Sequence, residues 1–194
     1  DDVESRGLGD VYKRQIQIIL LICGRMPVFD AITTSFGTAG TGGFGIKNDS
    51  IAGYSLYIKW VVTIFMILFG VNFNAYYLIL YKKFKSAFAM EEVKAYLIII
   101  IVSVVCIFFN ILKMSTSAVN AITDSAFQVA SIITTTGFST TDFNLWPEAS
   151  KTILIILMFI GACAGSTGGG IKVSRLVILI KSLGCLLYTS PSPR

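Results

Sequence analysis

Two stretches rich in threonine and glycine hold the residues of this chain that are best suited to chemistry. The first, residues 38–45, reads TAGTGGFG, and the second, residues 134–140, reads TTTGFST. Glycine permits an extended backbone whose neighbouring carbonyl groups can turn toward a cation and replace several of its water molecules at once. Threonine hydroxyls can add further oxygens or hold such a loop in place. Both stretches therefore predict a filter that selects ions, with potassium as the best-suited cation.

Eight residues of this filter are predicted to line the ion path, and six of them are predicted to bind potassium. Phe44 and Phe138 are expected to wedge the two loops against the scaffold rather than to touch the ion. The residues predicted to line the ion path are Thr41, Gly42, Gly43, Phe44, Thr135, Thr136, Gly137 and Phe138, and potassium is predicted at Thr41, Gly42, Gly43, Thr135, Thr136 and Gly137.

The two stretches occupy matching positions of an internal repeat. A shift of 94 positions places Asp30 on Asp124 and Thr41 on Thr135, and it also superposes the two Gly-Phe pairs. In each copy an apolar helix, a short segment that starts at aspartate, a Thr/Gly stretch and a second apolar helix follow one another. Either stretch alone could be a flexible turn between helices, but two copies at matching positions favour the filter interpretation.

A third glycine-rich stretch, residues 161–172 with the sequence GACAGSTGGGIK, interrupts an otherwise apolar run. Each glycine costs a helix about 1 kcal/mol relative to alanine, which favours an unwound loop with free carbonyls near the pore. Close helix packing through small residues is the alternative. A nucleotide-binding P-loop is disfavoured, because its lysine follows the last glycine directly and precedes Ser or Thr, whereas here Ile171 intervenes and Val173 follows.

Lys172 and Arg175 are the charges nearest the membrane interior beside this stretch. They could set an electrostatic barrier to cations or respond to a regulatory partner. The favoured interpretation is that their long side chains reach the cytoplasmic surface.

Composition requires a membrane around these elements. Apolar residues make up 54% of the chain, charged residues 14%, and the mean hydropathy is +0.74. Residues 60–81 and 95–112 are uncharged runs that approach or exceed the roughly 20 residues needed to cross about 30 Å of hydrocarbon, whereas residues 16–23 form only the end of a helix. The fold class predicted is an all-α polytopic membrane protein built from repeated helix–pore loop–helix units.

The predicted pore loops begin with short helices at residues 31–38 and 125–133, with Asp30 and Asp124 as their N-caps. Such helices are too short to cross and must re-enter the membrane beside water or protein. The predicted organisation is a non-native tail at 1–15; a repeat at 16–88 with pore loop 30–46 and second helix 55–81; a repeat at 89–184 with first helix 93–113, pore loop 120–141 and second helix 148–183 broken at 161–170; and a second non-native tail at 185–194.

The net charge of +5 reflects membrane topology rather than a nucleic-acid partner, because the basic residues do not form one stripe or face. Lys82, Lys83, Lys85 and Lys94 cluster between the two long apolar runs, which places that connection in the cytoplasm. Histidine is absent and the cysteines are far apart, so neither a zinc site nor a disulfide framework is indicated. No covalent cofactor is expected, and potassium is expected as the transported ligand.

The chain resembles the Trk/Ktr/HKT superfamily, and most closely its bacterial Trk-type subunit, from residue 16 to about residue 183. The match is strongest at 161–175, GACAGSTGGGIKVSR, and extends to 131–140 and 30–44. Gly45 departs from the Trk pattern, which more often has Ser there, and this leaves the ion selectivity open. By this resemblance the glycine-rich stretch is an intramembrane gating loop, formed by Gly161, Ala164, Gly165, Ser166, Thr167, Gly168, Gly169, Gly170 and Lys172.

The resemblance also implies a pore of four repeats around one axis, of which this chain would hold the second and third. It implies a multi-pass protein of the bacterial inner membrane, surrounded by lipid, that forms homodimers and binds a cytoplasmic nucleotide-binding regulatory subunit. The expected function is potassium uptake, channel-like or coupled to protons or sodium, and not enzymatic. The alternatives are a sodium-permeable or sodium-coupled member of the superfamily and, more remotely, a membrane-anchored nucleotide-binding enzyme.

Overall fold

The structure is a computed structural model, and it describes residues 2–80 and 90–189. Within these residues the regular elements are helices, apart from one isolated parallel bridge between Ile160 and Ile171. The all-helical prediction is therefore confirmed for this part of the chain. The elements are α1 (Asp2–Cys23), α2 (Val28–Ala39), α3 (Leu56–Phe69), α4 (Phe73–Leu80), α6 (Glu91–Ile111), α7 (Ala118–Ile133), the 3-10 helix η1 (Phe143–Leu145), α8 (Glu148–Phe159) and α9 (Val173–Thr189).

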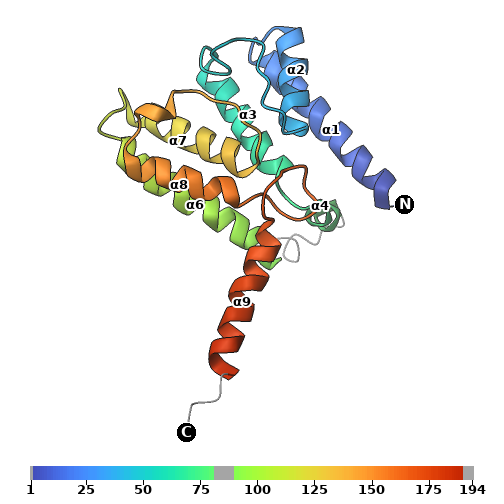
Figure 1. The fold of residues 1–194 in the computed structure, drawn as a ribbon. Helices are drawn as coiled ribbons and strands as arrows, with labels where there is room; N and C mark the ends of the chain where they lie inside the picture. The colour runs from blue at the N-terminus through green and yellow to red at the C-terminus, as the bar shows by residue number, and fades with distance from the viewer. Residues whose placement is uncertain (1, 81–89, 190–194) are drawn as a thin grey trace.

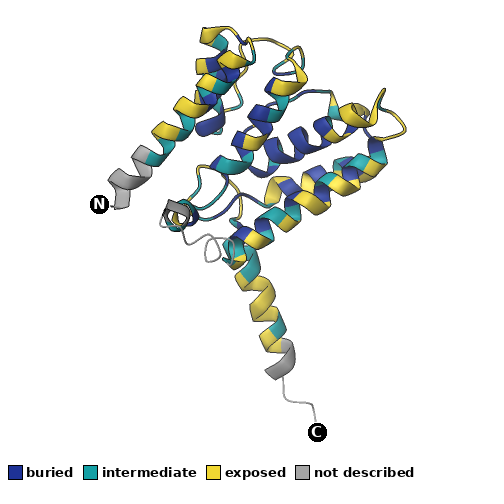
Figure 2. Cartoon of the chain, turned by 180° about the vertical axis from the view of Figure 1, so that it is seen from behind, coloured by how far each residue is buried: buried dark blue, intermediate teal, exposed yellow. Residues whose placement is uncertain are grey.

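The helices form two neighbouring groups (Figure 1). In the first group α1, α2 and α3 pack on one another, and in the second group α6, α7 and α8 do so. The groups join where α3 packs against α7, and buried residues gather on these two helices (Figure 2). By contrast, α9 extends away from both groups and carries mostly exposed residues. The first group contains helices from the first predicted repeat and the second group helices from the second, and the division into repeats stays a prediction.

Helix α1 continues through the segment that was expected to be a non-native tail. It runs from Asp2 to Cys23, so the change in composition before residue 16 does not interrupt the helix. Buried Gln17 fixes α1 against α2, since its Nε2 donates to Thr38 Oγ1 at 3.1 Å and its Oε1 accepts from Ser35 Oγ at 3.3 Å. At the other end α9 extends to Thr189, inside the second expected tail. The non-native origin of both tails remains a prediction.

The helix predicted at 55–81 is broken. It ends at Phe69, with Gly70 as its C-cap, and α4 starts only at Phe73. The Asn72 side chain accepts a bond from Asn74 N at 2.9 Å, which satisfies one free N–H at the start of α4. The hydropathy run conceals this break, because no charge or proline marks it. The predicted end at residue 81, and the lysines at 82, 83 and 85, lie outside the described residues.

Asp30 and Asp124 are not N-caps. Helix α2 begins at Val28 behind Pro27, so Asp30 lies in its first turn, and α7 begins at Ala118 behind Ser117, so Asp124 lies further inside the helix. Pro27 has no side-chain acceptor and caps by its fixed backbone angle, whereas the Ser117 hydroxyl accepts from Val119 N at 3.3 Å. The sequence predicted neither cap, because aspartate is itself a preferred N-cap residue and lies a few positions later in each segment.

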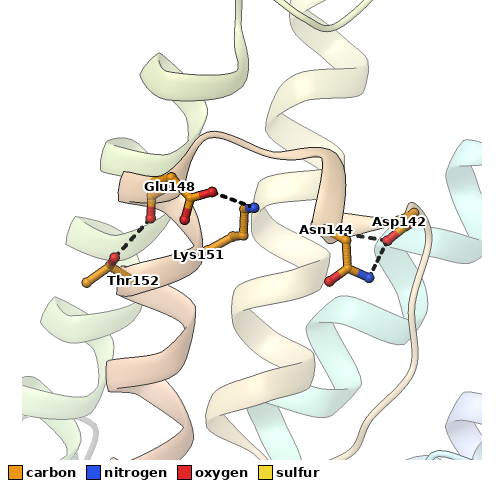
Figure 3. A network of polar contacts seen from close by, with 5 residues as sticks. All are labelled: Asp142, Asn144, Glu148, Lys151 and Thr152. Atoms are coloured by element: carbon orange, nitrogen blue, oxygen red, sulfur yellow. Dashed lines mark hydrogen bonds and ion pairs between the residues drawn. The ribbon is translucent and has the colours of Figure 1, made fainter.

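Helix α8 starts from a short polar network (Figure 3). Asp142 Oδ1 accepts from Asn144 N at 3.0 Å and from Asn144 Nδ2 at 2.9 Å, which closes η1. In the first turn of α8 Glu148 Oε1 accepts from Lys151 Nζ at 2.8 Å, and Thr152 Oγ1 donates to Glu148 O at 2.9 Å. These exposed contacts fix the polar start of a helix whose residues from Ile153 to Phe159 are all apolar.

Among the described helices one is long and apolar enough to cross a membrane by itself, and that is α6. The expected first helix at 93–113 corresponds to it, two residues earlier at each end. Leu56–Phe69 is apolar but shorter, because the break at Gly70 divides its run. The helix expected at 148–183 is interrupted between Phe159 and Val173, a slightly wider gap than the predicted 161–170.

Candidate functional site

The short helices α2 and α7 end in the same way at matching positions. Ala39 is the last residue of α2 and Ile133 the last of α7, which are 94 positions apart, as in the sequence repeat. Beyond each end a backbone N–H reaches back five residues: Gly42 N donates to Gly37 O at 2.9 Å, and Thr136 N donates to Ser131 O at 2.9 Å. This is the bonding of a Schellman motif, in which the chain turns sharply off the helix axis.

The turn places threonine in a backbone region that threonine avoids. Thr41 has φ 50° and Thr135 has φ 56°, and two residues later Gly43 has φ 66° and Gly137 has φ 89°. A left-handed conformation is a genuine outlier for a β-branched residue and costs on the order of 1–3 kcal/mol. Both loops therefore carry the same alternation, left-handed at the threonine and again at the glycine. Strain repeated at equivalent positions marks these loops as the candidate site.

The two loops meet each other. A Cβ built on Gly43 would lie 2.1 Å from Thr136 O and 3.0 Å from the Cα of Gly137, so only glycine fits there. Beyond this contact Ile51 N donates to Ser139 O at 3.1 Å, and Ser139 N donates to Ser50 Oγ at 3.3 Å. The two loops, which are far apart in the sequence, are thus joined by close backbone contacts and hydrogen bonds.

The aspartates shared by both repeats tie the loops to their own helices. Tyr54 Oη donates to Asp30 Oδ2 at 2.5 Å, and Thr140 Oγ1 donates to Asp124 Oδ1 at 2.9 Å. Burial and the bond to Asp30 raise the pKa of Tyr54 to about 12, so this phenol stays protonated and remains a donor at physiological pH. The sequence repeat identified this pair of aspartates but assigned them a different role.

Beside these ties the loop ends surround an open cavity of about 310 Å³. Two carboxylates lie in its wall, which is formed by Asp49, Ala52, Ser139, Thr140, Thr141, Asp142 and Phe143. The cavity is large enough for a hydrated ion and lies next to the Ser50–Ser139 contact of the two loops.

The glycine-rich stretch lies directly against both loops on their other side. Thr135 Oγ1 accepts from Gly169 N at 2.7 Å, and Thr41 Oγ1 donates to Thr167 O at 3.4 Å. A Cβ on Gly168 would lie 3.1 Å from Thr134 O. The Thr135 hydroxyl therefore holds the glycine-rich stretch, whereas the Thr41 hydroxyl bonds more closely to its own loop, at 2.8 Å to Gly40 O. A contact with the glycine-rich stretch was not among the roles predicted for these hydroxyls.

Backbone contacts also fix the two ends of this stretch. Gly161 N donates to Ile171 O at 2.8 Å, and Ile171 N donates to Phe159 O at 3.1 Å. Lys172 Nζ donates to Gly168 O, so the ammonium group folds back onto the loop instead of extending to the cytoplasmic surface as favoured from the sequence. An added Cβ on Gly161 would lie 1.9 Å from Gly169 O, which explains why this turn requires glycine.

Two polar contacts to the stretch come from residues to which the sequence analysis assigned no role, Gly70 and Glu92. Cys163 N donates to Gly70 O at 3.0 Å, at the break between α3 and α4. Glu92, in the first turn of α6, accepts from Ala164 N at 2.5 Å and from Asn72 Nδ2 at 3.2 Å. An acidic residue next to a hydrophobic run is a recognisable signal, but only tertiary packing reveals its partners.

The two phenylalanines of the Gly-Phe pairs behave differently. Phe138 is 1% exposed, and its Cζ would lie 3.0 Å from a Cβ on Gly37, so its ring packs on helix α2 of the other repeat. Phe44 is 85% exposed. The predicted packing role is confirmed for Phe138 and is wrong for Phe44 within the described residues.

Groups of three or more His, Cys, Asp or Glu that could hold a metal ion are absent from the described part of the chain. The polar groups that the two loops present are main-chain carbonyls, threonine hydroxyls and helix ends. Helices α2 and α7 both direct their C-terminal ends, which carry partial negative charge, at the strained loops. Such an arrangement attracts a cation without a full charge.

Comparisons with known proteins identify the family. The family model TrkH, described as a cation transport protein, matches residues 11–194. The chain belongs to the TrkH family. The resemblance to the Trk-type subunit is thus confirmed.

Relatives of the family also match in sequence and in structure. A "Trk system potassium uptake protein TrkH" of Salmonella typhimurium is 36% identical over 80% of this chain, and TrkG of Escherichia coli is 31% identical over 84%. The crystal structure of the potassium transporter TrkH from Vibrio parahaemolyticus superposes with a TM-score of 0.85 at 30% identity, covering 94% of this chain and 41% of that one. The chain spans about a third of the length of the curated relatives, 33% for the Salmonella protein.

The structural match also settles the fold class. The chain is an all-α polytopic membrane protein with the pore-loop repeats of the TrkH family. The exposed apolar side chains of α6 and α9 are consistent with lipid or further protein around them.

Proposed function

We propose that the protein to which this chain belongs takes up potassium ions across a membrane through the two Thr/Gly loops. The observation that carries the proposal is the duplicated left-handed geometry at Thr41 and Gly43 and at Thr135 and Gly137. Two loops that carry the same strain at matching positions and touch at Gly43 are suited to line one path. The names of the TrkH and TrkG relatives, all potassium uptake proteins, support potassium as the ion.

In the proposed mechanism carbonyl oxygens replace the water shell of the ion. The dipoles of α2 and α7 favour a cation at their C-terminal ends, and the glycines allow carbonyls of neighbouring residues to face it. The relatives' additional length would supply further loops around the same axis, since two loops enclose only part of an ion. Potassium would be held by Thr41, Gly42, Gly43, Thr135, Thr136 and Gly137.

The glycine-rich stretch at 161–170 is proposed as the gate. It contacts both loops through Thr41 and Thr135, so it lies where an ion would leave the filter. The stretch forms no regular helix, and its Gly165 and Gly170 have left-handed φ values. Because glycine tolerates a wide range of backbone angles, the stretch can change its conformation at a low cost in free energy. The ammonium of Lys172, bonded to Gly168 O, would oppose cation passage while the stretch holds its present position.

The proposed setting is the inner membrane of a bacterium, with several helices of the complete protein crossing it. We propose a homodimer and a cytoplasmic nucleotide-binding regulatory subunit as its partners, on the strength of the family membership. A protein of this kind is not an enzyme, and transport needs no covalent cofactor.

The remote alternative, nucleotide binding by the glycine-rich stretch, is disfavoured by its hydrogen bonds. A phosphate cradle needs several free N–H groups. Here the N–H groups of Gly161, Cys163, Ala164, Gly169 and Ile171 already donate to protein oxygens.

The test is rescue of a bacterium that lacks its own potassium uptake systems by the complete gene. Growth at low potassium is expected, with uptake of a potassium tracer that excess sodium does not inhibit. Uptake that sodium inhibits would support the sodium-permeable alternative. Failure of the correctly inserted protein to restore growth or tracer uptake would overturn the proposal.

A further inference from the structure

Glu92 joins two interruptions of helical structure that are distant in sequence. It lies half-buried in the first turn of α6. One carboxylate oxygen, Oε1, accepts from Ala164 N in the glycine-rich stretch at 2.5 Å, and the other, Oε2, accepts from Asn72 Nδ2 in the break between α3 and α4 at 3.2 Å. Both oxygens of one side chain are therefore used to connect the two breaks.

The orientation of Asn72 makes this connection specific. Asn72 Oδ1 accepts from Asn74 N at 2.9 Å, so the amide group must present its NH₂ to Glu92. Ala164 N is also a donor. Two donors that converge on one residue require two acceptor oxygens, which an ionised carboxylate supplies and an amide does not.

The neighbouring Glu91 provides a natural contrast. It is exposed, and its Oε2 accepts from exposed Lys181 of α9 at 2.5 Å. An exposed pair of this kind contributes little to stability. The two adjacent glutamates thus have the same charge, but only Glu92 contacts the glycine-rich stretch.

We propose that Glu92 is a positioning residue that holds the glycine-rich stretch in place beneath the Thr/Gly loops. Its bond at Ala164 adds to those of Cys163 N to Gly70 O and of Gly169 N to Thr135 Oγ1. The consequence for transport rests on the proposed function, since release of the stretch changes ion flow only if the stretch is the gate. The positional role itself is independent of what the protein transports.

The thiol of Cys163 reports the position of the stretch directly. Cys163 is fully buried next to Ala164, so a maleimide reacts with it only when the stretch opens. The complete protein is prepared in membranes with the other three cysteines of this chain, and any elsewhere in the protein, replaced by alanine. The rate of maleimide reaction then measures the opening equilibrium.

Three variants test whether residue 92 must supply two hydrogen-bond acceptors. Glu92→Gln leaves one donor facing an NH₂ group, and Asn72→Asp brings two carboxylates together while it keeps the acceptor for Asn74 N. Each is expected to raise the reaction rate about tenfold or more, as expected when a buried charge-assisted bond is lost. The double variant restores complementarity, because the new amide accepts from Ala164 N and donates to the new carboxylate. It is expected to react within about threefold of the wild-type rate.

Glu91→Gln is the matched control and should leave the Cys163 rate unchanged. Single variants that react as slowly as wild type, or a double variant that reacts as fast as either single one, would overturn the proposal. Tracer flux of the same variants is the second measurement, with faster flux expected for the singles and wild-type flux for the double. If the wild-type protein carries no potassium, the proposed function fails, while the Cys163 rates still decide the role of Glu92.

Discussion

The two threonines with left-handed backbone angles are the most informative residues of the site. Glycine or asparagine would occupy the same backbone at lower cost, yet Thr41 and Thr135 both occur there. Their hydroxyls explain the choice: Thr135 Oγ1 accepts from Gly169 N at 2.7 Å, while Thr41 Oγ1 donates to Gly40 O at 2.8 Å and lies 3.4 Å from Thr167 O. Conformational strain is thus retained where a side-chain oxygen couples the loop to its neighbour.

Gly43 offers a graded test of the contact between the two loops. In the complete protein, Gly43→Ala is expected to destabilise the fold by about 2 kcal/mol or more and to abolish uptake, because its Cβ meets Thr136 O at 2.1 Å in a left-handed backbone. Gly137→Ala should cost less, about 1–2 kcal/mol, since it meets only Gly43 Cα at 3.8 Å. Thermal unfolding and tracer uptake measure both effects.

Gly184→Ala is the control for these variants. Gly184 lies in α9 with open space around it, so alanine is expected to leave uptake intact and to add up to about 1 kcal/mol of helix stability. Equal effects of the alanine substitutions at Gly43 and Gly184 would contradict the close contact of the loops.

The sequence located the Thr/Gly positions because the repeat placed equivalent residues in register. It failed for Phe44, since identical motifs do not reveal that only Phe138 finds a glycine, Gly37, on the facing helix. It also missed Glu92, whose partners lie 20 and 72 residues away in the chain. Short-range pattern thus predicts backbone geometry, whereas side-chain partnership depends on packing.

At the scale of elements, both second helices of the repeats are interrupted and the interruptions are bonded to each other. The bond from Cys163 N to Gly70 O joins the break after α3 to the break after α8. Glycine content predicted the second break. The first escaped prediction because a single glycine in an apolar run is compatible with a continuous helix, and only the approach of Tyr96 shows why it is needed.

Gly70 and Tyr96 are expected to be energetically coupled. A Cβ on Gly70 would lie 2.2 Å from Tyr96 Oη and 3.0 Å from Thr134 Cγ2, so Gly70→Ala should destabilise the protein by about 1–3 kcal/mol. Tyr96→Phe removes the hydroxyl and its bond to Ile67 O, at a cost of about 1 kcal/mol. The double variant should be more stable than the sum of the two changes predicts, by about 1 kcal/mol, in a thermal-unfolding cycle. Strict additivity would count against the contact.

At the scale of the whole molecule, the two repeats pack on each other through α3 and α7, and the loops lie between the cavity near Asp142 on one side and the glycine-rich stretch on the other. The start of α6 lies beside that stretch, through Glu92. Lys94, in the first turn of α6, therefore belongs to the same side as the stretch, and the cavity near Asp142 belongs to the opposite side.

This arrangement predicts the membrane topology. Asn144 and Lys94 are both exposed, one beside the cavity and one in the first turn of α6. In a complete protein without native cysteines, a cysteine at position 144 should react with an impermeant maleimide in intact cells. A cysteine at position 94 should react only after the membrane is opened. The reverse pattern would invert the orientation inferred from the lysines.

Main-chain atoms make most of the contacts that define the glycine-rich stretch. Gly161 N, Cys163 N, Gly169 N and the carbonyls of Thr167 and Gly168 are present whatever the side chains are. A Cβ has no room at Gly161 and little room at Gly168 and Gly170. Natural variation in this stretch is thus limited by side-chain volume more than by chemical identity. Thr167 is exposed and contributes its carbonyl to the contact with Thr41, so the polarity of its side chain can change without redesigning the surrounding helices.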